Sequence, residues 1–235
     1  HCYFFRIMPV YQLHIANKNY SSWSLRPWVL LRQLGIEFEE CFESFETEDN
    51  FEKFRKFSPS GTVPCLVDAD AIVWDSLAIV EYLAEKEAGI WPEEASARAF
   101  ARCASAEMHS SFSSLREICP MNCAITVALS SLNADLVRDV NRIDELWQEG
   151  LARFGGGFLA GERFTAVDAF YCPVAFRVQS YQLAISPESF AYCQKLLSLP
   201  AMKAWDAAAI REPWREQAHE EEAKAAGRVI ADRRN

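Results

Sequence analysis

The sequence predicts a two-part molecule of class α/β plus all-α: a small mixed-sheet domain over residues 8–88 and an all-helical domain over residues 93–218. Strand-like and helix-like segments alternate before residue 90, and nearly everything after it has helical periodicity. Between the two parts stands Gly89-Ile90-Trp91-Pro92, where glycine can end a helix and proline cannot continue one. With 235 residues, half of them apolar, the chain can fill two modest cores.

Each element of the first part has its own signal. Residues 11–15 alternate apolar and polar side chains, which is typical of a half-buried strand. Residues 65–74 form two short apolar runs around an acidic turn, which predicts a hairpin. The expected order is strand 11–15, a helix ending at Gly35, a strand opened by Ile36 and Phe38, a short irregular helix over 51–57, the hairpin 65–74 and a helix from Ser76.

This order constrains the topology of the sheet. Two strands joined by a crossover helix should be parallel and right-handed, and the hairpin adds an antiparallel pair. The result is a small mixed sheet with helices on both faces, which is a thioredoxin-like layout.

The second part is expected to be helical throughout. Thr165-Ala166-Val167-Asp168 has the pattern of a capping box, and we interpret it as structural because capping needs no ligand. The tail 219–235 is highly charged and predicts a frayed helix or disorder. Residues 1–7 precede a more natural beginning at Met8-Pro9 and are expected to be an added or mis-assigned start. The helices are expected near 93–118, 134–153, 166–181, 187–198 and 200–210.

Composition and charge exclude several function classes. The formal net charge is −9, which disfavours binding to nucleic acid and to anionic membranes. No apolar run approaches the roughly 20 residues that span a bilayer, and the eight cysteines form no Cys-x-x-Cys pair. The four histidines lack metal-ligand spacing, so no metal is expected. A cytoplasmic protein with reduced thiols fits these features.

Three short segments should meet at one edge of the sheet, where ligands of open sheets bind. Ser21 and Ser22 begin the first helix, whose free N–H groups and positive dipole end favour an anion such as a thiolate. Val63-Pro64 precedes a strand and predicts a fixed turn, in which the bond before proline can be cis. Such a turn leaves the Val63 backbone free to pair with an extended peptide. Asp75-Ser76 begins the third helix and offers a hydroxyl to a second anion. Each serine alone is also an ordinary N-cap residue.

Together these segments resemble the glutathione transferase superfamily, over about Tyr11 to Trp214. The stretch Ser58-Pro59-Ser60-Gly61-Thr62-Val63-Pro64, followed by Trp74-Asp75-Ser76-Leu77-Ala78-Ile79, is similar to the glutathione-binding signature. Ser21-Ser22-Trp23-Ser24-Leu25-Arg26 is similar to the serine motif of the zeta class, Ser-Ser-Cys-Ser-Trp-Arg. Phe164 to Asp168 resembles the capping box of the family's helical domain.

The resemblance implies a role for each matched residue. Ser21 would stabilise the thiolate, with Ser22 as its close rival, and Val63 would pair with the cysteinyl backbone of glutathione beside a cis Pro64. Ser76, helped by Asp75, would hold the γ-glutamyl end. The resemblance also implies a detoxifying homodimer that joins glutathione to a small electrophile. Candidates for the electrophile pocket are Met108, His109, Phe112 and Arg116.

Two departures from the family pattern bear on the reaction. Trp23 stands where zeta enzymes have cysteine, so thiol chemistry by the protein at that position is excluded and transfer of the zeta isomerase activity is weakened. Thr62 stands where many members have a basic or amide residue, which puts one contact to the glycyl carboxylate in question. Two alternatives to a transferase remain: a glutathione-dependent cis-trans isomerase of the maleylacetoacetate type, and a non-catalytic binding protein.

Overall fold

A computed structural model describes residues 10–45 and 50–234 of the chain. The N-terminal part contains a four-stranded sheet of order β2-β1-β3-β4, in which β1 is parallel to β2 and antiparallel to β3. This is the predicted mixed, thioredoxin-like sheet. Its elements are β1 (Tyr11–Ile15), α1 (Ser22–Leu34), β2 (Phe38–Phe42), α2 (Asn50–Phe54), β3 (Cys65–Asp68), β4 (Ala71–Trp74) and α3 (Ser76–Ala84).

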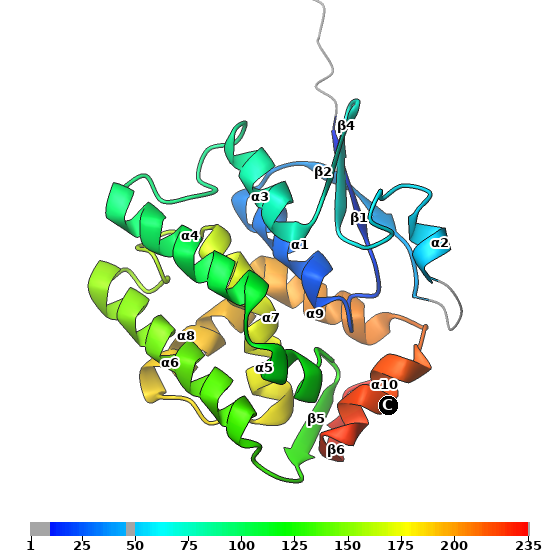
Figure 1. Cartoon of the computed structure of the whole chain (residues 1–235), viewed down its shortest axis with the longest axis vertical. Coiled ribbons are helices and arrows are strands. Elements are labelled where there is room, and N and C mark those ends of the chain that lie inside the picture. The colour runs from blue at the N-terminus through cyan, green and yellow to red at the C-terminus, as the bar shows by residue number, and fades with distance from the viewer. Residues whose placement is uncertain (1–9, 46–49, 235) are drawn as a thin grey trace, which may run out of the picture.

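The sheet has helices on both faces, with α1 and α3 on one side and α2 on the other (Figure 1). Leu13 and Ile15 of β1 are fully buried, while the alternate residue His14 stacks on Phe57 at 4.2 Å between ring centroids. The α1 helix ends as predicted at Gly35, whose φ of 69° is the left-handed conformation that glycine adopts without steric cost.

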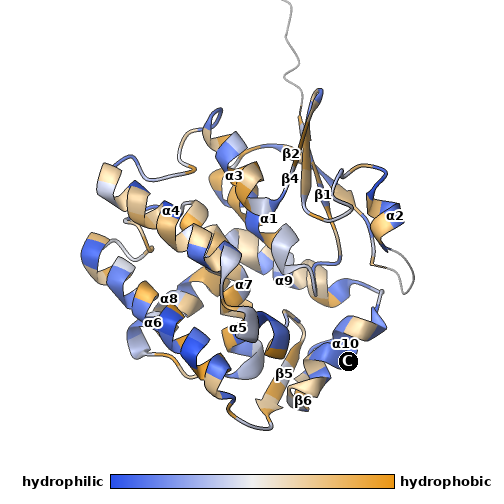
Figure 2. Cartoon of the chain, in the orientation of Figure 1, coloured by the Kyte–Doolittle hydropathy of each residue, from blue (hydrophilic) through white to orange (hydrophobic). Residues whose placement is uncertain are grey.

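The C-terminal part is mostly helical and is built around α7. Fifteen of the sixteen residues of α7 are buried, and the helix packs against α1, α4 and α8. Figure 2 shows hydrophilic residues along α6 and α10, which lie at the outside. The helices are α4 (Ala95–Ser110), α5 (Ser113–Ile118), α6 (Ala134–Phe154), α7 (Ala166–Tyr181), α8 (Pro187–Ser198), α9 (Pro200–Arg211) and α10 (Gln217–Ala225).

The single helix expected over 93–118 is wrong, because two helices meet at Phe112. Phe112 has φ 62°, a left-handed conformation that stops the first helix after two serines, which are weak helix formers. Arg116 then donates to the carbonyls of Met108 and His109 at 3.1 and 3.4 Å, so the last turn of α4 is capped by a side chain. The break turns α5 toward α6 and α10.

The expectation of a wholly helical second part is also wrong. Strand β5 (Ile125–Leu129) pairs antiparallel with β6 (Gly227–Asp232), about a hundred residues later in the chain. Most of the tail 219–235 is therefore folded as α10 and β6, beside β5 (Figure 1). Pairing with the distant strand β5 orders the charged tail, which its composition alone does not predict. The predicted start at residues 1–7 lies outside the described residues.

Candidate functional site

A cavity of about 510 Å³ opens at the N-terminal end of α1. Ser21 and Ser22 line it from one side, and Thr62 and Val63 line it from the other. A neighbouring cavity of about 370 Å³ shares Trp23, Thr62 and Val63 with the first. The three sequence segments predicted to converge thus line two neighbouring cavities with shared walls, which together are called the groove.

The two serine hydroxyls have different surroundings. Ser21 is the N-cap residue of α1 and is 5% exposed, but its side chain makes no capping hydrogen bond. Its Oγ instead donates to Ser24 Oγ at 2.7 Å, and Ser24 Oγ also accepts from the Ala16 N–H at 3.3 Å. Ser22 is half-buried, and its Oγ accepts from Arg177 Nη2 at 3.4 Å. Ser22 can present its proton to a ligand, because Arg177 donates to its oxygen, and Ser21 can do so when its proton turns away from Ser24.

The segment before β3 leaves backbone free for a ligand. The Val63–Pro64 peptide is cis, and sheet pairing of β3 begins only at Cys65. Among the described residues, Val63 forms no backbone hydrogen bond. An extended peptide lying along the groove could pair with it as an added strand would.

Asp75 and Ser76 lie at the N-terminus of α3 in the neighbouring cavity. Asp75 caps the helix through bonds from the Leu77 and Ala78 N–H groups, at 2.8 and 3.2 Å. It adopts φ 76°, a conformation that aims the carboxylate back over the helix end. Ser76 is 1% exposed and its Oγ accepts from Arg26 Nη1 at 3.2 Å, so its own proton is available to an anion.

His109 connects this end of the groove to the helical part. Its Nε2 lies 3.2 Å from Asp75 Oδ2, and its Nδ1 lies 3.5 Å from Arg26 Nη1. Burial lowers the pKa of His109, and the positive charge of Arg26 opposes the effect of Asp75. A neutral ring with its proton on Nε2 satisfies both partners.

Three arginines lie at or directly behind the groove in an otherwise acidic protein: Arg116 and Arg177 line it, and Arg26 lies behind Ser76. Arg26 is 2% exposed and its guanidinium lies 4.1 Å from the Trp23 ring centroid, while Arg116 lies 5.4 Å from the same ring. Arg177 is 3% exposed and donates from Nε to the Cys119 carbonyl at 2.9 Å. Burial, reinforced by Arg177 and Arg116, lowers the pKa of Arg26 to about 9, and burial lowers the pKa of Arg177 to about 10. Both therefore keep their charge at neutral pH.

Of the four residues suggested for the electrophile pocket, two line the cavities and two are buried in the core. Arg116 lines the cavity beside Ser22, and His109 lines the cavity beside Asp75. Met108 is fully buried in the core and Phe112 is 5% exposed, and neither lines either cavity. Met108 faces inward because it lies on the buried side of α4, with Ala101 and Ala104.

Sequence reasoning missed several residues that line the same cavity, among them the polar residues Arg177, Tyr20 and His219. Arg177 is the single charged residue among the buried residues that follow Asp168 on α7, and that isolation was a signal. Tyr20 is 4% exposed and donates to Glu220 at 2.6 Å; burial and this bond raise its pKa to about 12. The ring of His219 stacks between those of Tyr20 and Phe45, with centroid distances of 5.1 and 4.9 Å. It was missed because it lies in the tail that was expected to be a frayed helix or disordered.

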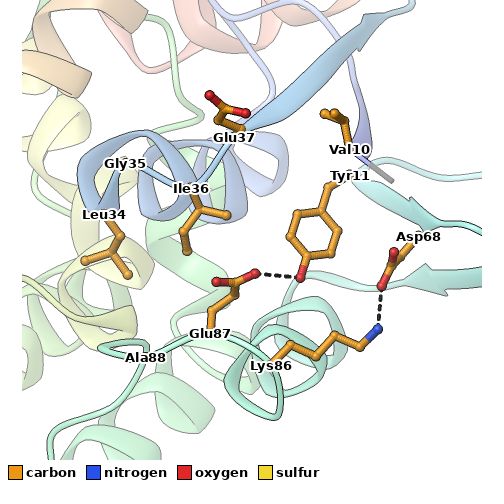
Figure 3. A pocket seen from close by; sticks show the side chains of 10 residues that line it. All are labelled: Val10, Tyr11, Leu34, Gly35, Ile36, Glu37, Asp68, Lys86, Glu87 and Ala88. Carbon is orange, nitrogen blue, oxygen red and sulfur yellow. Dashed lines mark hydrogen bonds and ion pairs between the residues drawn. The ribbon is translucent and has the colours of Figure 1, made fainter. Parts of the chain in front are cut away.

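A larger cavity, of about 900 Å³, lies elsewhere and carries none of the predicted chemistry. It is formed at the C-terminal end of α1, and α1 itself is about 20 Å long. Figure 3 shows that four of its ionisable groups form two pairs, Tyr11 with Glu87 at 2.8 Å and Lys86 with Asp68 at 2.6 Å. These pairs tie β1 and β3 to the end of α3.

Residues 10–45 and 50–234 contain no group of three or more side chains that could hold a metal ion. None of the helices in these ranges combines the length and apolarity that a membrane crossing needs. The seven cysteines of the described residues are free, and five are buried.

Comparison with known proteins matches this geometry to a family. A family model described as glutathione S-transferase, N-terminal domain, matches residues 20–86. Glutathione S-transferase Z1 of Arabidopsis thaliana is 39% identical over 74 residues, which cover 29% of this chain and 34% of that protein. A probable maleylacetoacetate isomerase of Vibrio cholerae is 26% identical over 190 residues, covering 77% of this chain and 88% of that protein. The chain spans only about a third of the length of the plant relatives that it matches in its N-terminal part.

The fold is shared with solved structures over nearly the whole chain. A glutathione transferase homolog from Burkholderia, solved with bound glutathione, superimposes with a TM-score of 0.63 at 18% identity, covering 86% of this chain and 98% of that one. The resemblance seen in the sequence is confirmed to this extent: residues 20–86 match the N-terminal domain of glutathione S-transferase, and the chain shares the fold of solved glutathione transferases.

Proposed function

We propose that the chain is a glutathione transferase that holds glutathione in the groove and presents its sulfur to a small electrophile. The observation that carries the proposal is the state of Ser21. It occupies the N-cap of α1, yet its hydroxyl makes no capping bond and lines the cavity. A hydroxyl that does not cap the helix, and whose proton can turn from Ser24 to a ligand, suits an anion bound at the positive end of α1.

The groove has a fitting contact for each part of glutathione. The unpaired Val63 backbone suits the cysteinyl peptide, and Ser76 with the α3 N-terminus suits the γ-glutamyl carboxylate. Thr62 would lie beside the glycyl end, where its side chain is exposed and bonded to Ser60 at 2.6 Å. The net charge of the protein repels an anion, so the binding energy must come from these local donors and from Arg26 and Arg177.

Ser21 is the better of the two candidate donors because it is the more buried. A hydrogen bond to a thiolate is stronger where water is excluded. When sulfur accepts the Ser21 proton, the Ser24 hydroxyl can turn to donate to Ser21 Oγ, which supports the new charge. A free thiol has a pKa of about 8.5, and each unit of lowering is worth about 1.4 kcal/mol in favour of the thiolate.

The reaction needs only ionisation and proximity. The thiol loses its proton to solvent, the sulfur lone pair forms a carbon–sulfur bond, and the electron pair displaced from the electrophile leaves with a halide or is protonated. The protein orients the two reactants and stabilises the thiolate.

Alanine substitutions of the serines test this proposal. We expect Ser21→Ala to lower kcat by at least about ten-fold with KM for glutathione changed by less than about two-fold. Ser22→Ala should have a smaller effect, because its hydroxyl is more solvated. The ultraviolet absorbance of bound glutathione thiolate, followed against pH, measures ionisation directly. If both variants retain wild-type turnover and titration, the assignment of a serine donor is wrong.

A second candidate is a glutathione-dependent cis-trans isomerase, and two observations favour it. Arg116 and Arg177 line the cavity and could hold the carboxylates of a maleylacetoacetate-like acid. The Vibrio cholerae relative that carries such a name covers most of this chain. Incubation with the cis acid distinguishes the two reactions, since an isomerase forms the trans acid without consuming glutathione.

A binding protein without catalysis is the remaining alternative. A carrier has no need to ionise the thiol, so absence of thiolate absorbance at neutral pH would support it.

We also propose a homodimer and a detoxifying role. Ile72 and Trp74 on the edge strand β4 are 47% and 45% exposed, and such an apolar edge suits a second copy. Sedimentation equilibrium checks the assembly state.

A further inference from the structure

The loop that leads into Ser21 is held largely by residues from the far end of the chain. Lys18 N–H donates to Glu212 at 2.7 Å, and the Lys18 carbonyl accepts from Trp205 Nε1 at 2.9 Å. Tyr20, the next residue but one, donates its hydroxyl to Glu220 at 2.6 Å. The backbone of the serine loop is therefore positioned by α9, α10 and the residues between them.

Glu220 is the centre of a buried ionic cluster. It is 8% exposed and accepts from Arg234 at 2.5 and 3.0 Å. The Arg234 side chain is 2% exposed and also bonds both carboxylate oxygens of Asp232. Burying such a cluster is a weak source of stability, but it fixes one geometry for the groups that it contacts.

The β5–β6 sheet connects this cluster to the same loop from a second side. Asn122, just before β5, accepts from Asn19 Nδ2 at 3.1 Å, and the Asn19 side chain in turn accepts from the Ala124 N–H at 3.1 Å. Arg233, just after β6, donates its N–H to the Ala124 carbonyl at 3.0 Å. Asn122 also lies 3.5 Å from Glu220, so the polar contacts form a closed ring around Asn19 and Tyr20.

The consequence reaches the hydroxyl and the N–H groups that would face sulfur. Tyr20 is joined directly to Ser21, and the Tyr20 carbonyl accepts from the Ser22 N–H at 2.9 Å. A shift of Tyr20 therefore moves both serines. Displacement of a catalytic group by about 1 Å can cost up to about a hundred-fold in rate.

We propose that the C-terminal unit of α10 and β6 is a positioning element of the thiol site, in which Glu220, held by Arg234, fixes Tyr20 and through it Ser21. This inference rests on the proposed function, because it concerns the same hydroxyl. Glu220, Arg234 and Tyr20 are positioning residues, and none of them needs to touch the sulfur.

A pair of single-atom variants tests the inference. Tyr20→Phe removes one hydroxyl bonded to a carboxylate at 2.6 Å, and Tyr82→Phe removes another, bonded to Asp68 at 2.8 Å on the far side of the sheet domain. We expect Tyr20→Phe to lower kcat about ten-fold, to leave KM for glutathione within about two-fold, and to raise the thiolate titration midpoint by about one pH unit. Tyr82→Phe should leave all three unchanged.

The possible results distinguish the positioning role of the C-terminal unit from the proposed transferase function. Glu220→Gln should reproduce the Tyr20→Phe result, and Tyr20→Phe remains decisive should that variant fail to fold. Wild-type turnover and titration in Tyr20→Phe would overturn the positioning role while leaving the transferase intact. A wild-type protein that forms no glutathione thiolate would instead overturn the proposed function. An equal fall of kcat in Tyr20→Phe and Tyr82→Phe would mean that general stability is the cause, which also overturns the inference.

Discussion

At the scale of single residues, the site places positive charge against the overall charge of the molecule. The protein carries a net charge of −9, yet Arg116 and Arg177 line one groove and Arg26 lies behind Ser76 of the same groove. Buried guanidinium groups act over short distances with little screening by water or salt. The site can thus attract an anion that the rest of the surface repels.

Substitution of Arg116 tests whether this positive charge selects second substrates that carry a carboxylate. Arg116→Gln should raise KM for a carboxylate-bearing second substrate by about ten-fold, because a charge-assisted hydrogen bond is lost, and change KM for a neutral electrophile by less than about two-fold. Steady-state kinetics with a matched acid and ester measure the difference. Arg138→Gln is the control, since the Arg138 side chain is 76% exposed and pairs with the exposed Asp135 of the same helix, α6. Equal effects on acid and ester would contradict a carboxylate contact.

The residues that the sequence identified are the ones whose signal is local. Ser21, Val63 and Ser76 each stand at a strand or helix end in a short motif, so their convergence follows from topology. Arg177 and His219 reach the same cavity from 156 and 198 residues beyond Ser21. The isolation of Arg177 in an apolar helix marks it as unusual but does not indicate which cavity it reaches, and no local pattern singles out His219. Long-range packing decides which side chains complete a pocket.

At the scale of elements, too, the strands and helices that pair with neighbours in sequence were predicted, and those that pair with distant segments were not. The hairpin β3–β4 and the crossover β1-α1-β2 pair neighbours in sequence, and period-2 and period-3.6 patterns predicted them. Strand β5 is apolar at four of its five residues and has no neighbour in sequence to pair with, and its partner β6 contains the charged residues Arg228 and Asp232. A strand of that kind exists only when its partner is in place.

Gly227 is the point at which this late sheet can be tested. A Cβ there would lie 2.0 Å from the Ala128 carbonyl oxygen, so Gly227→Val must push β6 away from β5. We expect a loss of several-fold in kcat together with a lower thermal midpoint, because Arg234 and Glu220 are displaced with the strand. Circular dichroism and steady-state kinetics measure the two effects.

The control for this variant is a destabilising change far from the serine loop. Gly35 has φ 69° with open space around it, so Gly35→Ala should cost about 1 kcal/mol through backbone strain alone. Its kcat should match the wild type. Should Gly227→Val keep full kcat at a lowered thermal midpoint, the β5–β6 sheet would be a stabilising feature only.

At the scale of the whole molecule, the chain folds back so that its last residues support its first loop. Glu212, Glu220 and Asp232 all come from the last two dozen residues and are all partly or fully buried. Burial opposes ionisation of Glu220, but bonds from Arg234 and Tyr20 outweigh it and lower its pKa. Arg234 likewise lowers the pKa of Asp232, against burial.

These lowered pKa values make the C-terminal unit sensitive to acid. A carboxyl whose folded pKa lies below its unfolded value adds stability above the unfolded pKa, here 4.5 for Glu220 and 3.8 for Asp232, and loses it as pH falls through the folded value. The buried Asp168 at the start of α7 behaves oppositely. Burial raises its pKa to about 6, so acid down to its unfolded value of 3.8 favours its folded state.

We therefore expect α10 and β6 to lose hydrogen-exchange protection between about pH 5 and about pH 3, before the first turn of α7 does. Protection factors corrected for intrinsic exchange, measured by mass spectrometry on peptides from the two regions, check the order. Arg234→Gln removes the partner that lowers both carboxyl pKa values, so its α10 should already be weakly protected at neutral pH and should change little on acidification. Simultaneous loss of protection in α7 and α10, in the wild type, would mean that the C-terminal unit opens only with the whole fold and that its ionic cluster does not set the acid response.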